Sequence, residues 1–339
     1  MLRSISKFEY AKTFIMFTGR IIRGFVVPYF MDSSQYSLYL RIVSFFRFSH
    51  LSEFGLREWA ISIYTKRQSL PKFQVLLLNL IFAIPAILLG YFFNLNILEI
   101  LCVFIFWMSL NLKYITNNIL AFNKDWKKLF EIELVGFIML LLGIFVFIQI
   151  PTIELILSLE IILSLIIIVY FLLLIRKNQS AHFSIRIKRK LSTLKEFLVG
   201  NGESLLIILV NEEIRPTLGI SFAFSGLFLY VSEFTSNKFV VSNQSLTQTV
   251  KLYSILSLIF LASYFILFLG PIQTIFPWAV FQISMPIGIS LVLLSKLNYS
   301  VLRKEDLIGS KNRITILKYQ NILTVLNVII LCWLFYLYS

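Results

Sequence analysis

Long apolar runs separated by short polar or basic stretches are the dominant pattern along the chain. Each run is about twenty residues long, the length with which an α-helix crosses a hydrocarbon core of about 30 Å. The runs do not alternate apolar and polar residues, as the strands of a membrane β-barrel would. We therefore predict about eleven (10–12) membrane-spanning helices, at residues 11–31, 36–56, 74–94, 97–121, 131–150, 153–175, 196–211, 217–234, 252–270, 273–295 and 316–338.

A basic segment divides these runs into two groups. Residues Arg176–Lys195 contain seven Lys and Arg residues and no acid, so this segment has to lie in water rather than in hydrocarbon. We expect three parts: a six-helix membrane bundle at 1–175, a basic cytoplasmic loop at 176–195, and a second bundle of about five helices at 196–339. The predicted fold class is an all-α polytopic membrane protein with two bundles.

Composition and charge support a membrane protein and argue against a nucleic-acid-binding one. The chain is 58% hydrophobic, above the level of about half that soluble domains reach. Its net charge of +14 comes from short clusters between apolar runs. Positive residues collect on the cytoplasmic side of membrane proteins and attract anionic lipids there. We therefore expect a membrane protein with a cytoplasmic N-terminus, anionic lipids as partners and no nucleic acid.

The predicted turns on the outer face are very short, such as Asp32–Gln35, Phe93–Asn96 and Ile150–Thr152. They leave no room for a soluble catalytic domain on that face. Cys102 and Cys332 both lie in apolar runs, and no metal-ligand spacing or nucleotide-binding loop is present. We expect no enzyme activity, no metal and no cofactor.

Ionisable residues inside the predicted spans are the candidates for function, because such residues usually face a cavity or a partner. Arg20 and Arg23 lie three residues apart, about 60° around one face of a helix. Together with Arg41 and Lys113 they form a candidate site for a pyrophosphate, since the arginine fork suits phosphate and stays charged out of water. The alternative is an amphipathic first helix whose arginines reach out to headgroups.

Other charged residues are candidates for ion pairs or for ion coupling. Arg47 and Glu53 lie close in sequence near the inner end of the second predicted span, and Glu160 and Glu203 lie in the sixth and seventh. Pro277 and Pro286 both fall within the tenth predicted span, where proline would kink a membrane helix.

Two short stretches of the N-terminal hairpin, Pro28–Tyr39 and Leu51–Arg57, stand at either end of an apolar span. They resemble the N-terminal hairpin of the polysaccharide (O-antigen-type) flippases of the multidrug/oligosaccharidyl-lipid/polysaccharide exporter superfamily. The start of the second helix is matched by Tyr36, Leu38 and Tyr39, and its end by Glu53, Phe54, Gly55 and Leu56. Met31-Asp32 and Ser37 depart from the family pattern, and the second half has one span fewer than the family's two six-helix lobes.

The resemblance implies a carrier of undecaprenyl-pyrophosphate-linked oligosaccharide that works by alternating access in the bacterial inner membrane. Other polysaccharide assembly proteins are implied as further partners. Three alternatives stay open: a membrane-embedded polysaccharide polymerase or glycosyltransferase, a small-molecule exporter of the same superfamily, and a non-transporting assembly protein.

Overall fold

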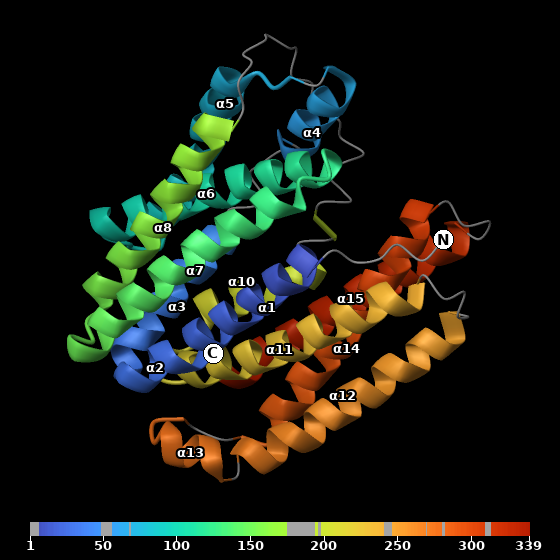
Figure 1. The fold of residues 1–339 in the computed structure, drawn as a ribbon. Coiled ribbons are helices and arrows are strands. Elements are labelled where there is room, and N and C mark those ends of the chain that lie inside the picture. Colours follow the sequence, from blue (N-terminus) through green and yellow to red (C-terminus); the bar gives the residue numbers. More distant parts are fainter. Residues whose placement is uncertain are drawn as a thin grey trace. The chain divides into compact units, whose positions relative to one another are not determined.

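The computed structural model describes residues 7–48, 56–67, 69–174, 194–195, 198–240, 246–268, 270–279, 282–308 and 313–339 (Figure 1). This part of the chain forms fourteen α-helices and one π-helical turn, and it contains no strand. The prediction of an all-α fold is confirmed.

The chain divides into two compact units, and the division crosses the first helices. Unit 1 includes residues 20–40 and 195–339, and unit 2 includes residues 3–19 and 41–194. One boundary therefore falls inside α1 (Lys7–Ile21) and another inside α3 (Ser33–Phe48). Residues 20–40 therefore pack with the second half of the chain. The expected division into two membrane bundles on either side of a basic cytoplasmic loop stays a prediction.

Unit 2 is built around α6 (Ile97–Phe122), which packs against its neighbours in the unit. These neighbours are α4 (Leu56–Arg67), α5 (Lys72–Phe92), α7 (Trp126–Gln149) and α8 (Ile153–Leu174). The side chains of Trp107, Leu112 and Ile115 on α6 are fully buried, because they face these helices. The core of this unit thus follows the apolar face of one central helix.

Local sequence signals set the ends of the central helices. Asn96 accepts a hydrogen bond from the backbone N–H of Glu99, whose carboxylate accepts one from the Asn96 N–H in return, a capping box at the start of α6. Asp125 caps α7 by accepting from the N–H of Lys128. These caps satisfy backbone donors that a helix start otherwise leaves without partners.

Unit 1 contains a π-helical turn η1 (Ile22–Val26), the short helix α2 (Val27–Phe30) and six further α-helices in the described part. Within it, α14 packs against α11, α12 and α15. A Cβ at Gly288 would lie 2.4 Å from Leu334, so α14 and α15 approach more closely there than a larger residue allows. The six helices are α10 (Gly202–Leu209), α11 (Arg215–Val240), α12 (Leu246–Phe268), α13 (Pro271–Ile275), α14 (Ser284–Ile308) and α15 (Arg313–Tyr338).

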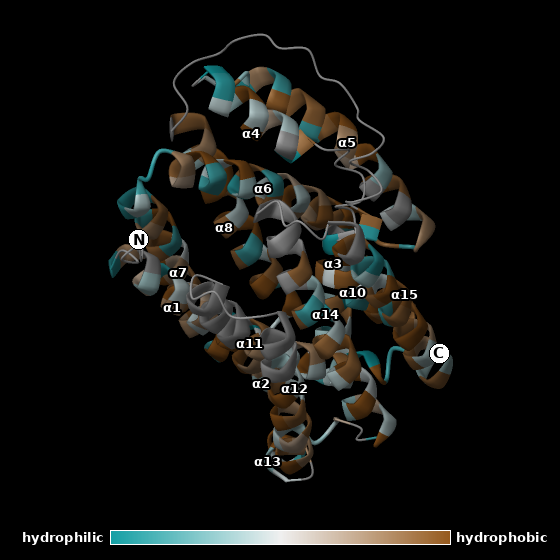
Figure 2. Ribbon diagram, turned by 90° about the vertical axis from the view of Figure 1, so that its right-hand side faces the viewer, coloured by the Kyte–Doolittle hydropathy of each residue, from teal (hydrophilic) through white to brown (hydrophobic). Residues whose placement is uncertain are grey.

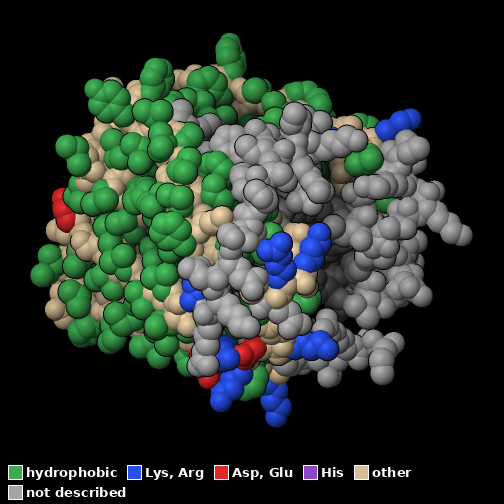
Figure 3. Space-filling view, turned by 90° about the horizontal axis from the view of Figure 1, so that it is seen from above, with side chains coloured by type: hydrophobic (Ala, Val, Ile, Leu, Met, Phe, Trp, Pro, Cys, Tyr) green, Lys and Arg blue, Asp and Glu red, His purple; other side chains and the backbone are tan. Residues whose placement is uncertain are grey.

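Five helices in the described ranges are long and apolar enough to cross a membrane. They are Lys72–Phe92, Ile97–Phe122, Trp126–Gln149, Ile153–Leu173 and Ile316–Tyr338, and α12 adds a shorter apolar stretch at Tyr253–Phe268. Figure 2 shows that hydrophobic residues make up most of α6, α8 and α15. Hydrophobic side chains cover much of the face drawn in Figure 3, and the charged side chains lie mostly along its border. The protein is a multi-pass membrane protein. The finer expectation of about eleven spans stays a prediction.

Two of the predicted spans differ from the observed helices. Residues 273–295 are not one helix, because α13 ends at Ile275 and α14 begins at Ser284. Pro277 lies between the two helices, and Pro286 lies in the first turn of α14, where its missing N–H has no helical partner to lose. Within 196–211, α10 covers only eight residues. Between the predicted spans 36–56 and 74–94 the chain forms a further helix, α4, which the hydropathy pattern did not predict.

Candidate functional site

The first helix carries the two arginines that the sequence singles out most clearly. Arg20 is exposed in the last turn of α1, and Arg23 is half-buried within η1. In η1 the N–H of Val27 donates to the carbonyl of Ile22, five residues earlier, which widens the helix locally. Such single π-helical turns inside α-helices are frequent at functional sites. The helix thus leaves regular geometry at the point where it carries charge.

A stripe of small residues on α11 lies against this part of the first helix. A Cβ added at Gly24 would lie 2.8 Å from the Cβ of Ala223, closer than side chains approach each other. A Cβ at Gly226 would lie 3.8 Å from Nη1 of Arg20. The guanidinium of Arg20 therefore extends along the small-residue face of α11, which leaves room for it.

The other two predicted phosphate ligands lie in unit 2. Arg41, half-buried on α3, donates a hydrogen bond to the backbone carbonyl of Phe93. Lys113, on α6, forms an ion pair with Glu133 of α7, with Nζ 2.9 Å from Oε2. Arg20 and Arg23 belong to unit 1. The joint action of all four cations on one ligand stays a prediction.

The Lys113–Glu133 pair was missed from the sequence because Glu133 lies close to the predicted start of its span. The side chain of Glu133 is only 8% exposed and that of Lys113 is 28% exposed. Oε1 of Glu133 and Oγ1 of Thr116 are buried and lack a hydrogen-bond partner in the described part of the chain. Buried polar atoms of this kind usually bond water or a ligand. The pair therefore holds two charges between α6 and α7 within unit 2.

Unit 1 contains a second buried ion pair. Glu203, near the start of α10, pairs with Lys296 of α14, and their side chains are 14% and 8% exposed. Oγ of Ser204 and Oδ1 of Asn327 are buried and without a partner among the residues described. Lys296 comes directly after the predicted span 273–295, but α14 continues to Ile308, well beyond it. The charge is therefore inside the helix bundle of this unit.

Arg215 is a buried arginine that lies between the predicted spans 196–211 and 217–234. Its guanidinium donates to the backbone carbonyls of Ile207 and Val210, at 2.8 and 3.0 Å, and to the hydroxyl of Ser37 at 2.9 Å. The last carbonyls of a helix have no partner within it and attract cations. Arg215 therefore closes the C-terminal end of α10 and ties it to α3 within unit 1.

The remaining predicted residues have different surroundings. Arg47 is exposed in the last turn of α3, and Glu160 is half-buried on α8. Glu53 lies outside the described residues, as does most of the central basic segment, Arg176–Lys195. No pairing of Arg47 with Glu53 can therefore be stated.

The searched part of the chain contains no group of three or more His, Cys, Asp and Glu residues that could hold a metal ion. No protein family, curated protein or solved structure matches the chain. The chain is a multi-pass helical membrane protein with charged residues held inside its helical units.

Proposed function

We propose that the protein transports a lipid-linked oligosaccharide with a pyrophosphate linkage from one leaflet to the other. The substrate class is an undecaprenyl-pyrophosphate-linked repeat unit used for surface polysaccharide in bacteria. The transport occurs by alternating access, without covalent chemistry. This proposal takes its substrate from the resemblance of the N-terminal hairpin and its cationic site from the residues of that hairpin.

The observation that carries the proposal is the arrangement of Arg20 and Arg23. Charged residues within membrane helices are costly, roughly 2.5–3.5 kcal/mol on insertion scales at the bilayer centre. They persist where they face a cavity or bind a partner. The π-helical turn and the small-residue face of α11 both lie beside these two arginines. Guanidinium groups at such a place suit the oxygens of a diphosphate.

Short connections between the described helices favour transport over an enzyme. Residues 93–96 join α5 to α6, residues 150–152 join α7 to α8, and residues 210–214 join α10 to α11. Each is too short to hold a catalytic loop of its own. A polymerase that acts on exported units would need such a loop.

The test uses the full chain in proteoliposomes loaded with a fluorescent lipid-linked pyrophosphate oligosaccharide. Movement to the outer leaflet is read from loss of fluorescence on adding a reductant that cannot cross the membrane. We expect Arg20→Ala plus Arg23→Ala to reduce the rate at least tenfold, since two ligands of the diphosphate are lost. Lys66→Ala plus Arg67→Ala, which removes two charges at the exposed end of α4, should leave the rate unchanged.

The result that overturns the cationic site is an equal rate for the arginine double variant and the unmodified protein. No movement by the unmodified protein, in the presence of an ion gradient of either direction, would overturn the proposed transport. In cells that lack the gene, complete lipid-linked units should accumulate while surface polysaccharide disappears. Single units that reach the outer face without being polymerised would instead indicate a polymerase.

A further inference from the structure

An open apolar groove follows one face of α8 in unit 2. Its volume is about 340 Å³, and every side chain that lines it comes from α8. The positions recur three and four residues apart, which places them on one face of the helix. The lining residues are Ile162, Leu165, Ile166, Val169, Tyr170 and Leu173.

The groove has the length of one lipid leaflet. From Ile162 to Leu173 the helix rises about 16 Å at 1.5 Å per residue, close to half of a hydrocarbon core of about 30 Å. Val169 is 53% exposed and Leu173 is 74% exposed. An acyl chain laid along this face would cover apolar side chains from the bilayer centre to the interface.

The end of the groove at Tyr170 adjoins the start of α7. Tyr170 packs against a buried cluster of Leu120, Leu129 and Ile132, together with Trp126, so its ring lies beside the first turns of α7. Aromatic rings with one polar end favour the membrane–water interface. This end of the groove is therefore at the headgroup level.

Four lysines lie around this same end. Lys72 donates to the carbonyl of Leu172 at 2.7 Å, at the C-terminal end of α8. Lys124, Lys127 and Lys128 belong to the turn before α7 and its first turn, and the side chains of Lys127 and Lys128 are 71% and 53% exposed. Most of the surface of the Lys127 and Lys128 side chains is therefore open to a ligand.

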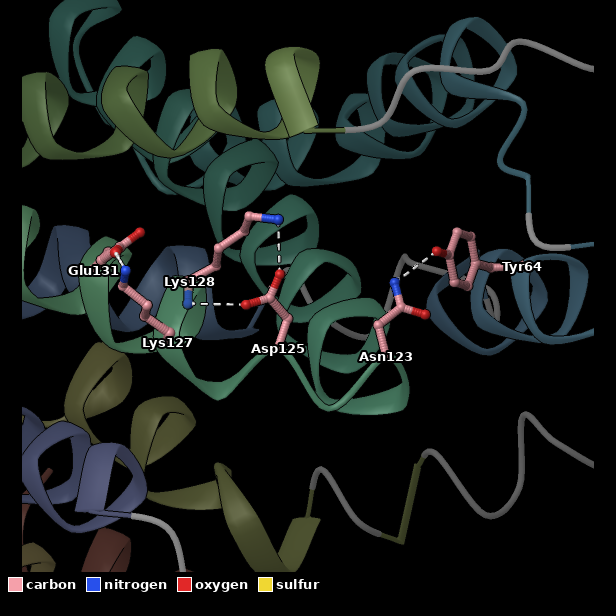
Figure 4. A network of polar contacts seen from close by, with 6 residues as sticks. All are labelled: Tyr64, Asn123, Asp125, Lys127, Lys128 and Glu131. Atoms are coloured by element: carbon pink, nitrogen blue, oxygen red, sulfur yellow. Dashed lines mark hydrogen bonds and ion pairs between the residues drawn. The ribbon is translucent and has the colours of Figure 1, made fainter.

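The acids at this end balance only part of that charge. Figure 4 shows Lys128 bonded to Asp125 and Lys127 beside Glu131, with Nζ–O separations of 2.7 and 3.9 Å. The Lys127–Glu131 ion pair is long, and both ion pairs lie at the surface, where such pairs are weak. Another anion can therefore readily replace the carboxylate of Asp125 or Glu131. Positive charge at one end of an apolar groove complements a lipid with an anionic headgroup.

We propose that this groove binds one anionic glycerophospholipid, with an acyl chain along α8 and its phosphate at Lys127 and Lys128. The site is separate from the arginines of the first helix and does not depend on the transport activity. A zwitterionic lipid with the same chains would fill the groove but would lose the attraction at its end.

The test measures lipid retained by the purified full chain with native mass spectrometry. The protein is stripped of lipid in detergent and then given phosphatidylglycerol or phosphatidylcholine with identical acyl chains. We expect phosphatidylglycerol to be preferred, and Lys127→Gln plus Lys128→Gln to reduce that preference about tenfold. One lysine near an anionic lipid strengthens its binding by a factor of about five, and two lysines by a factor of about thirty. We expect a smaller effect here because both lysines also have acidic neighbours, which offset part of their charge. Inorganic phosphate in excess should not displace the lipid, because it lacks the acyl chain.

Two matched controls separate this site from general surface charge and general lipid contact. Lys66→Gln plus Arg67→Gln removes two charges from the exposed end of α4 and should keep the preference. Val169→Trp fills the groove and should lower binding of both lipids, whereas Leu142→Trp, at a position 59% exposed on α7, should not.

An unchanged preference in the Lys127/Lys128 variant, or an equal loss in the α4 control, overturns the site. If Val169→Trp fails to fold, the lysine variant alone decides the outcome. Displacement of the lipid by inorganic phosphate would show a phosphate site without a lipid groove and would also overturn the proposal.

Discussion

Removing the charge of Lys296 tests how tightly unit 1 encloses its ion pair. Lys296→Met keeps an unbranched side chain of similar length but removes the ammonium that Glu203 bonds. The two side chains are only 8% and 14% exposed, so water cannot take the place of the lost partner without rearrangement. The variant therefore leaves a carboxylate in a poorly solvated position.

The size of the effect follows from the burial of the pair. Removing one partner of a buried ion pair costs about 3–5 kcal/mol, because the other charge is left without a partner in a poorly solvated position. Since 1 kcal/mol shifts the Tm of a domain of about 150–250 residues by about 2–4 °C, we expect a loss of about 10 °C.

The assay is thermal denaturation of the purified chain in detergent, followed by tryptophan fluorescence at pH 7. The control Glu203→Gln plus Lys296→Met removes both charges and should recover most of the Tm. A loss below about 1 kcal/mol in Lys296→Met would refute the burial of this pair.

Further predictions concern helix packing and capping. Gly24→Val should lower the Tm by several degrees, a cost of about 1–3 kcal/mol, because its Cβ would lie 2.8 Å from that of Ala223. Gly136→Ala on α7, which meets nothing within 4 Å, should keep or raise the Tm, and an equal loss in both variants would refute the close approach. Asp125→Ala should cost about 1 kcal/mol by removing the cap of α7, measured as the same shift in Tm. A hydrogen bond from the Lys128 side chain holds the pKa of Asp125 below its ordinary value. The stability that the ionised Asp125 contributes is therefore fully present above a pH of about 3.9 and is lost as the pH falls through the lowered pKa. A difference in Tm between Asp125→Ala and the unmodified protein that persists in strong acid would contradict this.

The sequence revealed individual charges within apolar runs but not the ion pairs that they form. Lys113 and Glu203 were recognised as charges within apolar runs, but their partners Glu133 and Lys296 were not. Those partners lie twenty or more residues away, near predicted helix ends, and hydropathy alone cannot tell an interface charge from a buried one. Pairing depends on which helices are neighbours and on how each is rotated. Both are properties of packing.

The π-helical turn at Ile22–Val26 could not be predicted either. Its sequence, with Arg23 and Gly24 between apolar residues, carries no local signal that distinguishes it from a regular helix. The close approach of Gly24 to Ala223 joins residues far apart in the chain. The same holds for Arg215, whose burial results from the end of α10 lying beside Ser37.

The sequence by itself determined that this is an all-helical, multi-pass membrane protein, because the length and polarity of a run decide whether it is stable in hydrocarbon. The predicted span 97–121 agrees with α6 (Ile97–Phe122), because an apolar run of that length marks a membrane helix by itself. Only the tertiary structure decided that residues 20–40 belong with the second half of the chain, and which charges are paired. These outcomes depend on side-chain fit and on exclusion of water between helices, and apolar runs of similar composition do not specify which of them will pack together.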